Sequence, residues 1–190
     1  METASLGGGF ADAPVDAARA FRACLNAMAR PGRIETVAGA APPAPLSVAA
    51  GVALLTLCDP ETPVHLAGAH DCGAVRDWIT FHTGAPFSGP AGAVFAVGSW
   101  AAVQPLDAYP IGTATYPDRS ATLIVEMPGL TAEGGARLSG PGIRDSARLA
   151  LPETAAFRRN AALFPLGLDF IFTAGDRLAA LPRTTRVEDA

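Results

Sequence analysis

The sequence predicts a single α/β domain in which a mixed β-sheet is flanked by helices on both faces. Helical and strand-like apolar runs alternate through the first half of the chain, and strands are expected to pair locally in the second half. The chain has 190 residues, of which 49% are hydrophobic and 17% charged, as is typical of one compact domain. No repeat or linker divides it, so we expect a flexible N-terminus over residues 1–13 and one domain over residues 14–190.

The first predicted helix runs from about residue 14 to residue 29. Asp12 and Pro14 are typical of a helix start, and Arg30-Pro31-Gly32 is typical of a helix end. Residues recur at helical spacing on one side, which predicts a mainly apolar face. This face carries Val15, Ala18, Arg22, Leu25 and Met28, with Phe21 beside them.

Apolar segments, together with the capping and turn residues beside them, predict the next helices and strands. Residues 48–57 are apolar almost all round, which predicts a buried helix, and Ser47 can cap it. Gly84 is typical of the residue that closes a further helix. In chain order we expect a strand over 33–37, the helix over 48–57, a strand over 64–67, a helix from 71 to 83, a strand over 93–97 and a helical turn within 99–109.

The second half of the chain is predicted to pair neighbouring strands and to end in one helix and a hairpin. In chain order we expect a long polar connection over 111–120, a strand over 121–126 that turns at Pro128-Gly129 and returns over 137–139, a tight corner over 140–142 and a last helix over 152–163.

A hairpin near the C-terminus is the clearest local feature. Residues 168–173 are apolar, aromatic and β-branched, Gly175-Asp176 supplies a two-residue turn, and residues 177–181 return as the second strand. Pro182 ends the pairing or marks an edge strand, because proline has no N–H to donate. The exit, Arg183-Thr184-Thr185-Arg186, carries two guanidiniums and two hydroxyls, which predicts contact with an anionic group. A solvated tail on an edge hairpin is the alternative.

Composition excludes several classes of protein. The net charge is −4 and no basic run occurs, so nucleic-acid binding is not expected. No apolar stretch of about 18 residues is present and the N-terminus lacks a basic segment, so we expect a cytoplasmic protein without a membrane span or signal peptide. Cys24, Cys58 and Cys72 are odd in number and lack CxxC spacing, which predicts buried thiols in a reducing compartment.

All fourteen cationic residues are arginine, and the chain contains no lysine. A Schiff base with pyridoxal phosphate or with a carbonyl substrate therefore cannot form, and a Walker-type phosphate loop is excluded because it requires a lysine. Arginine suits two-point contacts with carboxylate or phosphate groups, although genome base composition also produces chains rich in arginine and alanine.

The histidines and cysteines do not complete a metal site. His65, His70 and His82 lack metal-ligand spacing, and a zinc site from His70 and Cys72 would need two more ligands. His82 follows Phe81 at a predicted helix end, where carbonyl dipoles stabilise a protonated ring; a packed histidine is the alternative. No GxSxG sequence occurs. We therefore assign no catalytic, cofactor-binding or metal-binding residue.

The polar loop over residues 116–120 is one candidate site. It holds the acid Asp118 and the guanidinium of Arg119 just before a predicted buried strand. Loops at strand ends carry ligand contacts in α/β proteins. A surface loop without a function is the alternative interpretation.

A set of short motifs, specific through their order and spacing, spans the chain from about residue 14. They are Phe21-Arg22, Met28-Ala29-Arg30-Pro31-Gly32, Leu54-Leu55-Thr56-Leu57 with Asp59, Thr62-Pro63-Val64, Phe81-His82-Thr83-Gly84-Ala85-Pro86, Gly112-Thr113-Ala114, Phe164-Pro165-Leu166-Gly167-Leu168-Asp169 and Pro182-Arg183-Thr184-Thr185-Arg186. In this order they resemble the family of H subunits of the bacterial carbon–phosphorus lyase complex.

The resemblance implies a role in alkylphosphonate catabolism. It implies a fold like that of the pyridoxal-phosphate-dependent transferases, without the cofactor site, and the missing lysine agrees with this independently. It also implies a homodimer in isolation and a core complex with subunits G, I and J, joined by an ATPase-like subunit L. This complex, a ribose 1-methylphosphonate 5-triphosphate synthase, transfers the phosphonate to the ribose of ATP and releases adenine. The chain would act as a scaffold or accessory subunit that binds no cofactor itself.

Six residues are candidate contacts for a ligand or partner: His82, Asp118, Arg119, Arg183, Thr184 and Arg186. Arginine at a protein interface is a frequent anchor, so we expect Arg183→Ala to weaken assembly more than folding. One alternative is a free-standing small-molecule enzyme with Arg119, His82 and Arg183 around an anion. Another is a nucleotide-binding regulatory module.

Overall fold

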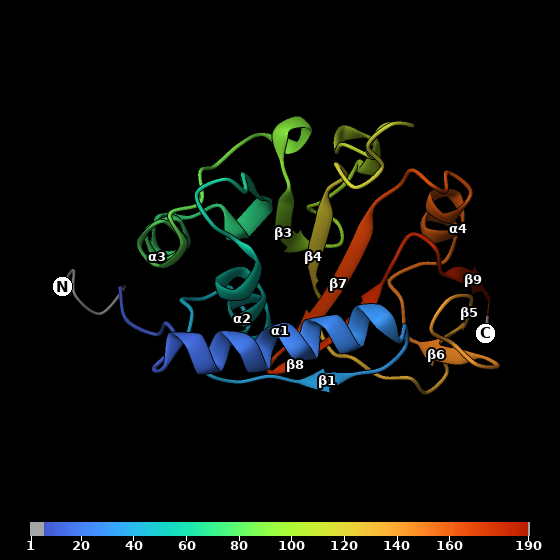
Figure 1. The fold of residues 1–190 in the computed structure, drawn as a ribbon, viewed down its shortest axis with the longest axis horizontal. Coiled ribbons are helices and arrows are strands. Elements are labelled where there is room, and N and C mark those ends of the chain that lie inside the picture. Colours follow the sequence, from blue (N-terminus) through green and yellow to red (C-terminus); the bar gives the residue numbers. More distant parts are fainter. Residues whose placement is uncertain (1–5, 190) are drawn as a thin grey trace.

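A six-stranded mixed sheet runs through the centre of the molecule in the order β1-β8-β7-β4-β3-β2 (Figure 1). The structure is a computed structural model that describes residues 6–189. Four neighbouring strands, β2, β3, β4 and β7, run parallel, whereas β8 and β1 add antiparallel pairs at one side. The bounds are β1 (Glu35–Thr36), β2 (Val64–Leu66), β3 (Phe95–Ser99), β4 (Thr122–Glu126), β7 (Asp169–Ala174) and β8 (Arg177–Leu181).

Three helices cover one face of this sheet: α1 (Ala13–Ala29), α2 (Val48–Leu57) and α3 (Gly73–Thr83). As predicted, α2 is buried along most of its length, and the Ser47 hydroxyl accepts a hydrogen bond from the Ala50 N–H at 3.1 Å. The prediction that Gly84 closes α3 is also confirmed, since Gly84 is its C-cap in the left-handed conformation. In Figure 1, α1 lies across the lower edge of the molecule, next to α2.

The other face is covered by α4 (Ala155–Ala161) and by a second, three-stranded sheet in the order β6-β5-β9. The strands of this sheet are β5 (Ala136–Ser139), β6 (Ala147–Leu149) and β9 (Arg186–Glu188). Between α4 and the central sheet, Phe157 stands edge-on to Phe170 at a centroid distance of 4.9 Å. Three short 3₁₀ turns lie in the connections: η1 (Gly68–His70), η2 (Pro90–Gly92) and η3 (Leu106–Ala108).

The predicted pairing of residues 137–139 with the strand over 121–126 is wrong. β4 lies between β3 and β7 and pairs with both, so neither of its edges is free for a returning strand. β5 instead pairs with β6 and with β9, which forms where an unpaired tail or anion contact was expected. The last helix is also shorter than predicted, because α4 ends at Ala161.

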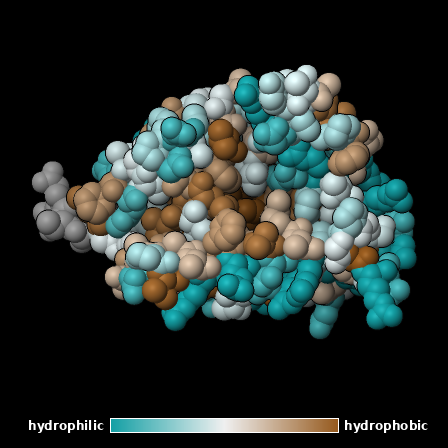
Figure 2. Space-filling model, viewed as in Figure 1, coloured by the Kyte–Doolittle hydropathy of each residue, from teal (hydrophilic) through white to brown (hydrophobic). Residues whose placement is uncertain are grey.

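The predicted apolar face of α1 is not the face that the helix buries. Its buried residues are small, namely Ala20, Cys24 and Ala27, whereas Phe21 and Leu25 are more than half exposed. The contact partners of α1 include α2, whose six buried residues include three alanines and a glycine, so the two helices approach closely through small residues. The larger apolar side chains of α1 therefore face outward. Figure 2 shows hydrophobic residues on this face, along and above α1.

The N-terminal segment is only partly described. Residues 1–5 of the segment predicted to be flexible lie outside the described residues. Within the described part, the Trp78 indole N–H donates to the Gly7 carbonyl at 2.9 Å, and the Ala41 N–H donates to the Gly8 carbonyl at 2.8 Å. No helix within residues 6–189 has the length and apolar character needed to cross a membrane.

The three thiols differ in exposure. Cys24 and Cys58 are buried as predicted, and burial raises the pKa of the Cys24 thiol to about 11 and that of Cys58 to about 12. Cys72, before α3, is only partly buried. At a pKa of 11, only about one thiol in a thousand is ionised at pH 8. The two buried thiols are thus protected by both inaccessibility and protonation.

We therefore predict one rapidly reacting thiol per native chain with dithionitrobenzoate at pH 8, and three after unfolding in guanidinium. The rapid phase should come from Cys72, and Cys72→Ser should remove it. Two rapid equivalents in the native wild-type chain would contradict the burial of Cys24 and Cys58.

Candidate functional site

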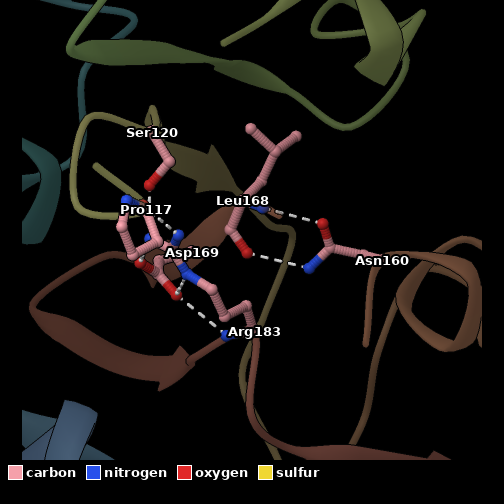
Figure 3. A network of polar contacts seen from close by, with 6 residues as sticks. All are labelled: Pro117, Ser120, Asn160, Leu168, Asp169 and Arg183. Atoms are coloured by element: carbon pink, nitrogen blue, oxygen red, sulfur yellow. Dashed lines mark hydrogen bonds and ion pairs between the residues drawn. The ribbon is translucent and has the colours of Figure 1, made fainter. Parts of the chain in front are cut away.

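Arg183 lies at the centre of a polar network that joins three segments of the chain (Figure 3). Its backbone N–H and its Nε–H both donate to Asp169 Oδ1, at 2.8 and 3.2 Å, and its Nη2 donates to Asp169 Oδ2 and to the Ser120 hydroxyl. Its Nη1 donates to the Pro117 carbonyl at 2.6 Å. The guanidinium thus fastens the loop before β4 and the start of β7 to the exit of the C-terminal hairpin.

The hairpin itself brings this pair of charges together. Phe170 pairs with Leu181 in the register of β7 and β8, so the residue before Phe170 and the residues after Leu181 meet just beyond the last pair. An aspartate is disfavoured inside an apolar strand, and here Asp169 occupies its first position. Pro182 interrupts the pairing, and Arg183 then turns back onto the carboxylate.

The network leaves little of the guanidinium for an external anion. The side chains of Arg183 and Asp169 are only 13% and 15% exposed. Nε, both N–H groups of Nη2 and one of Nη1 have partners, so four of the five donors of Arg183 are in use. The arrangement is that of a structural ion pair.

The loop that Arg183 holds contains the predicted residues Asp118 and Arg119, both exposed. The Arg119 guanidinium lies 4.2 Å from the centre of the Tyr116 ring, which is a cation–π contact. Gly112 gives the loop its closed shape, because it has a φ of 82° and a Cβ there would lie 2.6 Å from the Pro117 carbonyl oxygen.

A shallow, mainly apolar hollow opens beside the network, and we call it the proline-lined basin. Its volume is about 650 Å³. Residues from α1, the loop before β4, the corner after β5, the segment before β7 and the hairpin exit line it. They are Leu25, Met28, Ala29, Pro117, Asp118, Pro141, Gly142, Phe164, Pro165, Asp169, Pro182, Arg183 and Thr184. Four prolines make the lining stiff, and Leu25 and Phe164 at its margin are 54% and 60% exposed.

A second hollow of about 390 Å³ adjoins the basin and shares Pro141, Phe164, Arg183 and Thr184 with it. It extends to Arg186, which is exposed on β9. The structure therefore gathers four of the six predicted contacts on one surface, namely Asp118, Arg183, Thr184 and Arg186.

His82 belongs to a different contact group. It lies in the last turn of α3, and its ring is edge-on to both Trp78 and Phe81 at centroid distances of 5.0 and 4.9 Å. Its Nε2 lies 3.4 Å from the Gly7 carbonyl. His82 thus packs against the N-terminal segment, and its contacts have no residue in common with those of Arg183.

Sequence reasoning did not identify Asp169, Ser120 and Asn160 as members of the network. Asn160 is buried at the end of α4, and its side-chain amide pairs with both the N–H and the carbonyl of Leu168, at 2.7 and 2.8 Å. The contact of Asp169 could have been predicted from the sequence, because a turn at Gly175-Asp176 places Asp169 beside the hairpin exit. Ser120 lies in the polar loop over residues 116–120 that the sequence predicts as a candidate site, but its contact with Arg183 has no local signal, and neither has that of Asn160 with Leu168.

The surface offers rigid apolar contacts with a carboxylate and a guanidinium at its margins, from Asp118 and Arg186. Protein–protein interfaces have this composition, with an apolar centre and a polar rim. Within residues 6–189, no group of three or more His, Cys, Asp or Glu side chains is arranged to hold a metal ion. The apolar centre and charged margin of this surface suit contact with another protein.

Comparisons with known proteins extend the resemblance noted in the sequence. The model of the family described as bacterial phosphonate metabolism protein (PhnH) matches residues 8–188. A protein of Rhizobium meliloti (strain 1021) named alpha-D-ribose 1-methylphosphonate 5-triphosphate synthase subunit PhnH is 43% identical over 193 residues, which cover 95% of this chain and 94% of that protein. A protein of Stutzerimonas stutzeri named putative C-P lyase subunit protein HtxG is 29% identical over 199 residues, or 94% of each chain.

The network leads to a prediction about stability. Arg183→Ala leaves the largely buried Asp169 carboxylate without its partner, so we expect the free energy of unfolding to fall by about 3 kcal/mol. Arg183→Lys should recover only part of this, because an ammonium cannot form the forked contacts. Urea unfolding followed by circular dichroism measures both.

Arg119→Ala is the control, because this neighbouring guanidinium is exposed and its cation–π contact with Tyr116 should contribute no more than about 1 kcal/mol. Equal unfolding midpoints for Arg183→Ala and Arg119→Ala would contradict the structural role of the ion pair. The expected loss of folding stability replaces our first expectation, from the sequence, that Arg183→Ala acts mainly on assembly.

Proposed function

The chain belongs to the PhnH family of bacterial phosphonate metabolism proteins, and from this membership we propose that it is an accessory subunit of a carbon–phosphorus lyase complex. The observation that carries the proposal is the 43% identity, over nearly the full length of both chains, to a relative named as a subunit of ribose 1-methylphosphonate 5-triphosphate synthase. In the proposed reaction the complex transfers a phosphonate to the ribose of ATP and releases adenine.

The role proposed for this chain is to supply a surface and not the reacting groups. The absence of lysine removes the usual means of holding pyridoxal phosphate, so we propose that the chain binds no cofactor and that ATP is a substrate of the complex alone. Arg183, one of the two hairpin-exit guanidiniums predicted to contact an anionic group, is paired within the chain. Independent turnover would require groups that this surface does not offer.

We propose the proline-lined basin and its neighbouring hollow as the docking surface for other subunits. Phe164 stands at the border of both hollows and is 60% exposed, and Leu25 and Phe21 extend the apolar area along α1. An exposed cluster of large apolar residues is typical of an interaction site. Arg186 at the rim adds a guanidinium, which is a frequent anchor in interfaces.

The proposed partners are subunits G, I and J, with the ATPase-like subunit L, and a second copy of this chain in their absence. The proposed location is the cytoplasm. The parallel core with antiparallel strands at one side is compatible with kinship to the pyridoxal-phosphate-dependent transferase fold, and this kinship also stays a proposal.

The alternative of a free-standing enzyme requires Arg119, His82 and Arg183 around one anion. His82 packs on the N-terminal segment, and Arg119 lies over the Tyr116 ring. No contact in the described structure joins these three side chains, so we do not favour this alternative.

The proposed role predicts co-purification. When the chain carries an affinity tag and is expressed with the neighbouring phosphonate-utilisation subunits, it should elute with them at a fixed ratio. Elution of the tagged chain alone, from cells that contain the other subunits in soluble form, would contradict the role.

The docking surface predicts that Phe164→Asp weakens assembly by about 30-fold or more, since a charge would enter the apolar centre of the interface. The melting temperature of the isolated chain should stay unchanged, because Phe164 is exposed. Phe81→Asp is the matched control, as Phe81 is 61% exposed on α3 and outside both hollows. Wild-type co-purification of Phe164→Asp would exclude this surface.

A further inference from the structure

A separate cavity lies between α4 and residues 104–111, and we propose, independently of any role in the complex, that it binds a small organic anion. The ligand has an apolar body, alkyl or aryl, and a carboxylate, phosphate or phosphonate group that pairs with Arg159. Neither the predicted site residues nor the proposed docking surface includes this cavity. Its lining comes from the connection between β3 and β4, from α4 and from the segment before β7.

The cavity has the size and lining of a small-molecule site. Its volume is about 450 Å³, which lies within the usual range for such sites. Tyr109, Ala156 and Leu168, all 5% exposed or less, contribute buried wall, and Leu106 and Ile111 add further apolar side chains. An alkyl or aromatic body would lose its contact with water here without displacing any charged group.

Hydrogen bonds between the walls hold this cavity open. The Asn160 side-chain amide forms hydrogen bonds with both the N–H and the carbonyl of Leu168. The Gly167 N–H donates to the Ile111 carbonyl at 3.0 Å. The Tyr109 hydroxyl and His65 Nδ1 lie 3.1 Å apart and share a hydrogen bond. The Asn160 amide and the Tyr109 hydroxyl are therefore each hydrogen-bonded within the protein, which fixes both side chains in the wall.

The charges that line the cavity are Arg159 on α4 and Asp107 on η3, both exposed. Arg159 makes no ion pair with any carboxylate of residues 6–189, whereas its neighbour Arg158 pairs with Asp189 at 3.0 Å. A guanidinium presents a planar fork that matches carboxylate and phosphate oxygens. Asp107 repels an anionic group and so directs it toward the α4 side, where Arg159 lies.

The residues that line the cavity show that it is not an empty void left by imperfect packing of the core. Empty cavities in proteins are lined by apolar groups and closed to water. Here Gln104, Asp107 and Arg159 are exposed residues that also line the cavity, so the space is connected to solvent. A buried apolar wall beside a charged margin is the arrangement that binds amphiphilic small molecules.

The test is isothermal titration calorimetry of the full chain with three probes of one shape: 2-naphthoate, 2-naphthyl phosphate and the uncharged 2-naphthol. We expect both anions to bind at one site per chain and the naphthol to bind at least about tenfold more weakly. The tighter of the two anions identifies the head group. No measurable binding of any probe at millimolar concentration would overturn the proposal, and so would equal binding of all three.

Two charge variants make the test specific. Arg159→Gln should weaken binding of the anions by about tenfold, while Asp107→Asn should strengthen it by a few-fold because the repulsion is removed. Arg19→Gln is the control for net charge, since Arg19 is 78% exposed on α1. Equal affinity of wild-type and Arg159→Gln would place the probe elsewhere and overturn the proposal.

A third variant tests the body of the cavity. Ala156→Leu extends a buried side chain into the space and should abolish binding of the anions, with the melting temperature reporting that the chain remains folded. Unchanged binding to folded Ala156→Leu would overturn the proposal. Loss of binding in these variants with normal co-purification would separate this site from the docking surface.

Discussion

The ion pair between Arg183 and Asp169 is the constraint on which the surface around it depends. It closes the open end of the β7–β8 hairpin and at the same time holds the Pro117–Ser120 side of the loop before β4. Forked donors in a mostly buried site allow one geometry only, and removal of either partner leaves a charge with poor solvation. The shape of the proline-lined basin therefore depends on one guanidinium, four of whose five donors are engaged within the chain.

Three consecutive residues connect this ion pair to the cavity beside α4. Leu168 lines the cavity and Asp169 meets Arg183, because successive side chains alternate in direction along an extended chain. Gly167 permits the close passage, since a Cβ there would lie 3.0 Å from the Asn160 side-chain oxygen and 3.4 Å from Arg183 Cβ, at a φ of 126°. The two hollow regions thus share one wall, and a larger residue at 167 would disturb both.

The elements that the sequence predicts well are those that local chemistry decides. Ser47 caps α2, Gly84 ends α3, and the turn at Gly175 forms the hairpin, each from residues within a few positions. The predictions that are wrong concern pairings for which distant segments of the chain compete. β5 cannot reach β4 because β3 and β7 occupy both edges, which only the full strand order reveals. The correctly predicted hairpin places Asp169 beside Arg183, so this contact could have been predicted from the strand register. Ser120 and Asn160 come from segments distant in the sequence, and residue spacing does not predict their contacts.

The orientation of α1 shows what helical periodicity leaves undecided. Helical spacing identifies an apolar stripe but not the side on which the helix is buried, and α1 has a second stripe made of Ala20, Cys24 and Ala27. Burying these small residues lets α1 approach α2 closely, and the strand contacts of β8 complete that face. The cost is that Phe21 and Leu25 remain in water. Exposed clusters of large apolar side chains are typical of interaction sites, so these two residues fit the docking surface proposed above.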